Sequence, residues 1–62
     1  MEYIYVVYGS NGLPDWDMDA DTWMISVHRT KEGAELAVLD RQTSPTVPWE
    51  REWEIRREPL RD

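Results

Sequence analysis

The 62-residue chain has no cysteine, and it has no lysine or arginine within residues 1–28. Without cysteine, neither a disulfide nor a thiolate metal site can stabilise a chain so short that folding buries only about 60% of its unfolded surface. There is no run of about 20 apolar residues and no basic leader followed by an apolar segment, so we expect neither a membrane span nor export. These absences favour a single domain, residues 1–62, in the cytoplasm.

Charge is divided unevenly along the chain. Residues 1–28 hold five acidic residues and no basic ones, a net charge of −5, whereas residues 29–62 hold eight acidic and seven basic residues, a net charge of −1. A concentrated negative field repels phosphate backbones and attracts basic surfaces. We therefore expect a protein partner with a basic surface and no direct contact with nucleic acid.

Hydrophobic periodicity predicts two strands joined by a long hairpin connection. Residues 2–9 are almost entirely β-branched or aromatic at both parities, which is typical of a central strand. In residues 22–28 the hydrophobic pattern has a period of two, and Trp23, Ile25 and Val27 are the side chains expected to face inward. The connection, an acidic hairpin loop over residues 10–21, is longer than the loops of about two to five residues in common hairpins.

The second half of the chain predicts one helix and a third strand. Thr30 is suited to cap a helix over residues 31–42. A stripe of small apolar residues would face the sheet: Ala34, Ala37 and Val38. Leu36 and Leu39 either flank that core or are exposed. Residues 49–57 alternate between an inward set, Trp49, Trp53 and Ile55, and a solvated charged face, Glu50, Glu52, Glu54 and Arg56.

The element order β-β-α-β indicates the fold class α+β. A right-handed crossover from the second strand to the third leaves the first strand between them, antiparallel to both. The result is a three-stranded antiparallel sheet in order 2-1-3 with one helix packed on one face. One side of the first strand must then lie on the open face, either Tyr3-Tyr5-Val7 or Ile4-Val6-Tyr8. This face is a candidate protein-binding or homodimer surface, with Tyr3 and Tyr5 as candidate residues.

The most distinctive stretch is Leu13–Asp21, where aspartate occupies every second position from 15 to 21. Trp16 and Met18 stand between the acids. One interpretation is a solvated loop that only confers solubility. The other is an acidic recognition loop with Trp16 and Met18 as apolar anchors, since tryptophan is enriched at binding hot spots. Its candidate binding residues are Asp15, Trp16, Asp17, Met18, Asp19 and Asp21.

The alternating aspartates also suggest a calcium loop, which needs oxygen ligands at alternating positions, a glycine at the sixth position and a glutamate at the twelfth. Counted from Asp15, the sixth residue is Ala20 and the twelfth is Ser26. The EF-hand pattern therefore fails at both diagnostic places. Weak binding of a divalent ion by another geometry stays open, but no metal or other cofactor is expected.

Few residues suit catalysis. His28 is the only histidine, and it ends a strand with no cysteine or second histidine to share a metal. A hydrolase that uses two carboxylates needs a cleft, for which so small a chain offers little room. We expect no enzymatic activity.

Two consecutive arginines end the third strand. Arg56 belongs to its charged face, whereas Arg57 shares parity with Trp53 and Ile55. Ion pairing with neighbouring glutamates is one interpretation, worth about 0–1 kcal/mol when exposed. Contact with a partner is the other, because arginine is enriched at interfaces.

An opening strand, a helix start and a closing strand carry a likeness to known proteins: Tyr3-Ile4-Tyr5-Val6-Val7, Thr30-Lys31-Glu32-Gly33-Ala34 and Trp53-Glu54-Ile55. In these the chain resembles a broad set of small uncharacterised phage and bacterial proteins of ββαβ type. Thr30–Leu39 and Trp53–Pro59 are also similar to the helix start and last strand of the short acidic RNA-polymerase inhibitor of lytic podophages. That family grips the polymerase with acidic residues and last-strand arginines, which implies a binding role for Arg56 and Arg57.

These features together predict a non-enzymatic, acidic protein-binding module encoded by a phage. It would inhibit or modulate a host nucleic-acid machine through the acidic hairpin loop, with RNA polymerase, a CRISPR effector or another defence nuclease as the target. The alternative is a self-associating structural module that uses the open aromatic sheet face.

Overall fold

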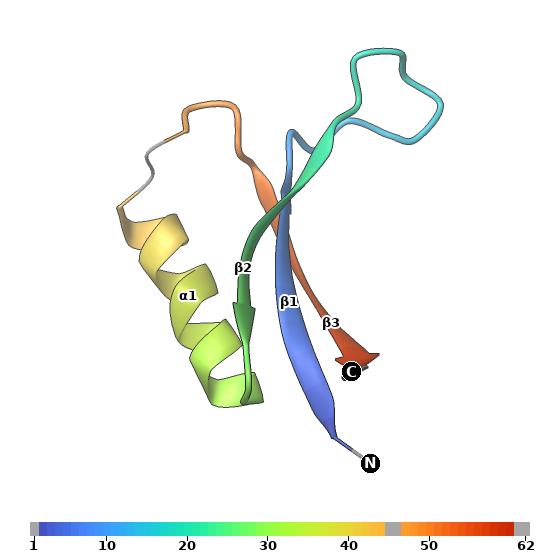
Figure 1. Cartoon of the computed structure of the whole chain (residues 1–62). Helices are drawn as coiled ribbons and strands as arrows, with labels where there is room; N and C mark the ends of the chain where they lie inside the picture. The colour runs from blue at the N-terminus through green and yellow to red at the C-terminus, as the bar shows by residue number, and fades with distance from the viewer. Residues whose placement is uncertain (1, 45–46, 61–62) are drawn as a thin grey trace.

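A computed structural model of the chain describes residues 2–44 and 47–60. The elements follow the order β1 (Tyr3–Ser10), β2 (Thr22–His28), α1 (Lys31–Thr43) and β3 (Glu52–Pro59). The strands form one antiparallel sheet in order β2-β1-β3, with α1 packed against it (Figure 1). The predicted α+β fold, its strand order and its helix are confirmed.

The central position of β1 follows from its composition. It pairs with β3 along its whole length, from Tyr3 opposite Pro59 to Ser10 opposite Glu52, and with β2 from Tyr5 onward. Val6 and Val7 point to opposite faces of the sheet, and both are buried. Because side chains of both parities are buried in β1, the strand needs apolar residues at both, as it has.

The helix α1 begins at Lys31, directly after the predicted N-cap residue Thr30. The Thr30 backbone is extended, and its hydroxyl oxygen accepts a hydrogen bond from the Gly33 amide at 3.1 Å. Ala34 is fully buried against the sheet, so its small side chain lets the helix lie close. Of the two alternatives for Leu36 and Leu39, the structure supports exposure, because both side chains point to solvent on the outer side of α1.

The predicted inward set of β2 is wrong at Val27. The register between β1 and β2 shifts near Tyr8: Tyr8 lies opposite Met24 and Val7 lies opposite Ser26, so Ile25 is an extra residue on β2. A bulge of one residue moves every later side chain to the other face of the sheet. Val27 is therefore 50% exposed on the face opposite the helix, while Ser26 and His28 lie on the helix side.

The third strand begins at Glu52, later than the expected residue 49. Residues 47–50 form a turn, in which the Glu50 amide donates to the Val47 carbonyl at 3.1 Å. The inward position predicted for Trp49 is consequently wrong, and its side chain is largely exposed. The solvated position predicted for Glu50 is also wrong, because Glu50 is 7% exposed.

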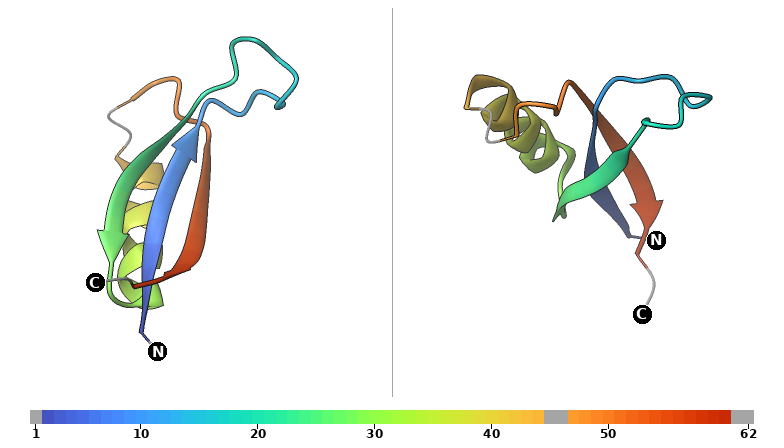
Figure 2. Two further views of the ribbon diagram at one scale, coloured as in Figure 1. Left: turned by 45° about the vertical axis from the view of Figure 1, so that its right-hand side comes forward. Right: turned by 90° about the horizontal axis from the view of Figure 1, so that it is seen from above.

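The acidic loop, residues 11–21, projects from the end of the sheet that lies away from the first and last described residues (Figures 1 and 2). The Cα radius of gyration is 12.6 Å. A compact chain of this length would have a radius of about 11 Å. The excess reflects a thin molecule with a protruding loop. No helix among the described residues is long and apolar enough to cross a membrane.

Candidate functional site

One side chain closes the base of the acidic loop. The Asn11 side-chain oxygen accepts from the Leu13 amide at 3.3 Å and from the Asp21 amide at 3.2 Å. Its side-chain nitrogen donates to the Asp19 carbonyl at 2.6 Å. Asn11 therefore joins both ends of the loop, and Gly12 beside it adopts a positive φ of 75°, which a glycine adopts without strain.

Two turns shape the tip of the loop. The Asp17 amide donates to the Pro14 carbonyl at 2.9 Å, and the Ala20 amide donates to the Asp17 carbonyl at 3.1 Å. The Asp17 carboxylate also accepts from the Asp19 amide at 2.8 Å, a local bond that favours turns. The loop backbone is thus held by its own hydrogen bonds and needs no packing from its apolar side chains.

The apolar residues of the tip are displayed to solvent. Trp16 is 84% exposed and Met18 is 99% exposed, and acids flank both. Burying a large aromatic side chain is worth several kcal/mol, and a partner would gain this free energy here because the fold does not use it. The structure therefore places the sequence-predicted residues 15–19 and Asp21 together on one protruding loop.

The aspartates of the loop are not gathered around a common point. Among residues 2–44 and 47–60, no group of three or more histidine, cysteine, aspartate or glutamate side chains is close enough to hold a metal ion. Within the described part of the chain, Asp15, Asp17, Asp19 and Asp21 form no ion pair. Asp15, Asp19 and Asp21 are exposed, so their charge faces solvent.

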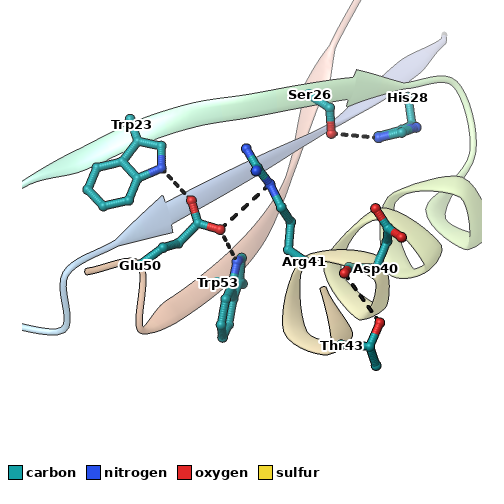
Figure 3. Close-up of polar contacts among 8 residues, drawn as sticks. All are labelled: Trp23, Ser26, His28, Asp40, Arg41, Thr43, Glu50 and Trp53. Atoms are coloured by element: carbon teal, nitrogen blue, oxygen red, sulfur yellow. Dashed lines mark hydrogen bonds and ion pairs between the residues drawn. The ribbon is translucent and has the colours of Figure 1, made fainter. Parts of the chain in front are cut away.

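The buried carboxylate of Glu50 lies next to Gly9, close to the base of the acidic loop. The two oxygens of Glu50 accept from the indole nitrogens of Trp23 and Trp53, each at 2.7 Å (Figure 3). The Arg41 Nε lies 3.6 Å from the same carboxylate. We call Trp23, Arg41, Glu50 and Trp53 the indole–carboxylate cluster. Because burying a charge is costly unless it is paired and hydrogen-bonded, these three partners explain how Glu50 can be buried.

The cluster connects directly to the base of the loop. Gly9 precedes the loop, and a Cβ atom added to it would lie 2.9 Å from a Glu50 carboxylate oxygen. The Arg51 amide donates to the Ser10 carbonyl at 2.8 Å. Trp23 follows the loop by two residues. The cluster therefore bonds to β2 through Trp23 and lies against β1 at Gly9, the two strands from which the loop emerges.

The two arginines of β3 stack on tyrosines of β1. The Arg56 guanidinium carbon lies 4.7 Å from the centre of the Tyr8 ring, and that of Arg57 lies 4.5 Å from the centre of the Tyr3 ring. Arg56 also donates to the Glu54 carboxylate at 3.0 Å, which raises the pKa of the already basic guanidinium. Arg56 thus makes the predicted local ion pair, and a partner contact by either arginine stays a prediction.

The sequence allowed two sets of β1 side chains on the open face of the sheet, and the structure has the set that begins at Ile4. Met24 and Val27 of β2 lie opposite Tyr8 and Val6 of β1, so Ile4, Val6 and Tyr8 form this face. Tyr3 and Tyr5 have the other parity and lie on the helix side, where Tyr5 shares a hollow of about 260 Å³ with Lys31 of α1. Their role as binding residues stays a prediction, but the open face does not carry them.

A hollow lies at the end of the sheet remote from the acidic loop. It measures about 540 Å³, and its lining includes Tyr3, Tyr5 and His28. The His28 ring is paired with the Ser26 hydroxyl at 2.8 Å (Figure 3). This hollow includes none of the residues of the acidic loop.

Sequence reasoning missed Glu50 and Asn11. Two signals in the sequence indicate a buried hydrogen-bond acceptor such as Glu50. Tryptophan indoles need a hydrogen-bond partner when buried, and a glycine inside a strand, here Gly9, often marks a close approach by another group.

Comparisons of the chain with protein-family models, curated proteins and solved structures find no match. The structure itself shows the ββαβ topology with a three-stranded antiparallel sheet.

Proposed function

We propose that this chain is a non-enzymatic protein-binding module that acts through its acidic loop on a host protein with a basic surface. The observation that carries the proposal is the display of Trp16 and Met18, at 84% and 99% exposure, on a loop held by its own hydrogen bonds. Ordering a loop on binding costs conformational entropy, and a loop already held by its turns loses less of it.

The charge of the loop defines the kind of partner. Four carboxylates surround two apolar side chains, and the chain has no basic residue before Arg29. Such a surface is repelled by nucleic acid and attracted by the grooves that bind it. We therefore propose a phage-encoded inhibitor or modulator of a nucleic-acid machine: RNA polymerase, a CRISPR effector or another defence nuclease.

The resemblance to the acidic RNA-polymerase inhibitor of lytic podophages supports polymerase as the first target to test. In that family the last-strand arginines and acidic residues contact the polymerase. The corresponding residues here are Arg56 and Arg57, and Arg56 lines a hollow of about 360 Å³ that also includes Asp15 of the loop. A polymerase contact that uses the loop and β3 together fits this arrangement.

Transcription by purified bacterial RNA polymerase tests the proposal directly. The wild-type chain should inhibit transcription, and the Trp16→Ala and Met18→Ala variants should lose inhibition at least about tenfold, as expected for hot-spot residues. Leu36→Ala is the matched control, because Leu36 is an exposed apolar residue on the outer side of α1. Equal potency of the loop variants and the control would overturn the role of the loop.

A salt titration separates the electrostatic part of the proposal from the apolar part. Replacing Asp15, Asp17, Asp19 and Asp21 with asparagine should weaken capture of the partner at low salt and flatten its salt dependence. The same titration applies to a CRISPR effector if the polymerase shows no response. Unchanged capture by the asparagine variant at low salt would contradict the electrostatic part.

A further inference from the structure

The two edge strands of the sheet, β2 and β3, differ in how they are protected against pairing with another chain. β3 carries charged side chains along its length and ends in a proline: Glu52, Glu54, Arg56, Arg57, Glu58 and Pro59. Charges and proline on an edge strand discourage pairing with another chain. β2, with the sequence TWMISVH, has no acidic residue, lysine, arginine, proline or glycine. Charges and a proline therefore protect the β3 edge, whereas β2 has neither.

The outer edge of β2 is uncovered in the described part of the chain. Figure 2 (left) shows β2 along the outer side of the sheet with α1 behind it. Apart from their pairing with β1, residues 22–28 form no backbone hydrogen bond with the rest of the described chain. Beside this edge, on the open face, Met24 is 63% exposed and Val27 is 50% exposed. Unpaired backbone groups next to exposed apolar side chains are what an added strand can cover.

The charges that flank β2 are self-complementary. Asp19 and Asp21 lie just before the strand, and Arg29 and Lys31 lie just after it; all four side chains are exposed. Within residues 2–44 and 47–60, Asp19, Asp21 and Arg29 make no ion pair, and Lys31 has only a long contact of 3.9 Å with Glu35. An antiparallel copy of the same segment would bring the acidic end of each strand to the basic end of the other.

We propose that β2 pairs antiparallel with β2 of a second copy of this chain, which joins two sheets into one of six strands. The bulge at Ile25 selects the register, because directly opposed residues must lie on the same face. With Met24 opposite Val27 of the second copy, Trp23 lies opposite the second copy's His28. The Met24–Val27 pair then lies on the open face, and the Trp23–His28 pair lies on the helix side. The twofold axis passes between Ile25 and Ser26, so each contact occurs twice.

This register explains two features of the monomer together. Met24 and Val27, the exposed apolar residues of β2, pair with each other across the axis and form a four-residue apolar cluster. The antiparallel arrangement points the two acidic loops toward opposite ends of the dimer, which limits the repulsion between chains of net charge −6. The tips at Trp16 and Met18 stay free, so the inference does not rest on the proposed function.

Sedimentation equilibrium over a wide concentration range tests the dimer. The wild type should show a reversible monomer–dimer equilibrium, and Val27→Lys or Met24→Lys should raise the dissociation constant at least about tenfold, because a charge on an edge strand opposes pairing in both halves of the dimer. Leu36→Lys is the control and should dimerise as the wild type does. Circular dichroism confirms that each variant is folded. A wild type that stays monomeric at all concentrations overturns the proposal.

Exchanging the charges of Asp21 and Arg29 tests the antiparallel orientation of the two β2 strands without altering a residue of β2. Asp21→Arg and Arg29→Asp should each weaken dimerisation about three- to tenfold, and the double variant should recover most of the loss. Additive losses in the double variant contradict the antiparallel arrangement.

Intermolecular nuclear Overhauser effects in a mixed isotope-labelled dimer test the register. Contacts between Met24 and Val27 of different copies support it. Contacts confined to Ile4 and Tyr8 would show stacking of open faces instead, and would overturn the edge pairing. None of these measurements involves the polymerase, so their failure is distinct from failure of the proposed function.

Discussion

Trp23 and Trp53 lie on opposite edge strands of the sheet, yet their indole N–H groups donate to the two oxygens of one carboxylate, that of Glu50. Both tryptophans are also paired in register with Gly9 of the central strand. The missing side chain of Gly9 leaves the space that the carboxylate occupies, since a Cβ there would lie 2.9 Å from it. One acidic side chain therefore ties β2 to β3 across β1.

Replacing Glu50 with glutamine should destabilise the fold. A glutamine amide has one accepting oxygen, so its NH₂ group would face one of the two indole N–H donors. A buried donor without an acceptor costs about 1–3 kcal/mol, a large part of the stability of so small a domain. Urea unfolding followed by circular dichroism measures the loss.

The matched control for this prediction is Glu52→Gln. Glu52 is an exposed acid near the start of β3 and carries the same charge. Its replacement should change the free energy of unfolding by less than about 0.5 kcal/mol. Equal effects at both positions would show that net charge, and not the indole–carboxylate cluster, sets the stability.

Gly9→Ala should be destabilising for the same structural reason. The added methyl would meet Ile25 Cδ1 at 2.9 Å as well as the Glu50 carboxylate, which its two indole donors hold in place. Overpacking of this kind costs about 1–3 kcal/mol. In a double-mutant cycle with Glu50→Gln, the two losses should be less than additive, because both disturb one contact. Strict additivity would place the effect of Gly9 elsewhere.

The elements that could be predicted from the sequence have local causes. β1 is apolar at both parities, so its central position follows wherever the other strands lie. Thr30 caps α1 through a bond to the amide three residues later, a pattern contained within one turn. The β-β-α-β order then leaves few topologies, and the observed order β2-β1-β3 is the one expected.

The errors came from features that alternation cannot reveal. A period of two that continues through Ile25 places Val27 in the core, but the structure has an extra residue at Ile25. A strand that begins at Trp49 places Glu50 in solvent, but β3 begins at Glu52. The burial of Glu50 depends on Trp23, Trp53 and Arg41, which come from three different elements. Neither the bulge nor the indole–carboxylate cluster can be predicted from the hydrophobic periodicity of the sequence.

The N-cap of α1 gives a prediction that is independent of the cluster. Thr30→Ala removes the acceptor of the Gly33 amide and should lower the free energy of unfolding by about 1 kcal/mol. Thr30→Ser keeps the hydroxyl and should be close to neutral. Chemical denaturation of both variants checks the difference, and a loss with serine as large as that with alanine would assign the effect to the methyl group of Thr30.

Asn11 should control the order of the acidic loop more than the stability of the fold. Asn11→Asp keeps the oxygen that accepts from Leu13 and Asp21 but replaces the donor to the Asp19 carbonyl with an acceptor, so this link becomes repulsive. Amide hydrogen exchange at Leu13, Asp19 and Asp21 should accelerate, while exchange in β1 stays as in the wild type. The exposed Trp16→Ala variant is the control, since it alters the tip without a backbone partner and should leave these rates unchanged. If Asn11→Asp leaves the loop amides protected, the two turns alone hold the loop, and Asn11 is dispensable for the display of Trp16 and Met18.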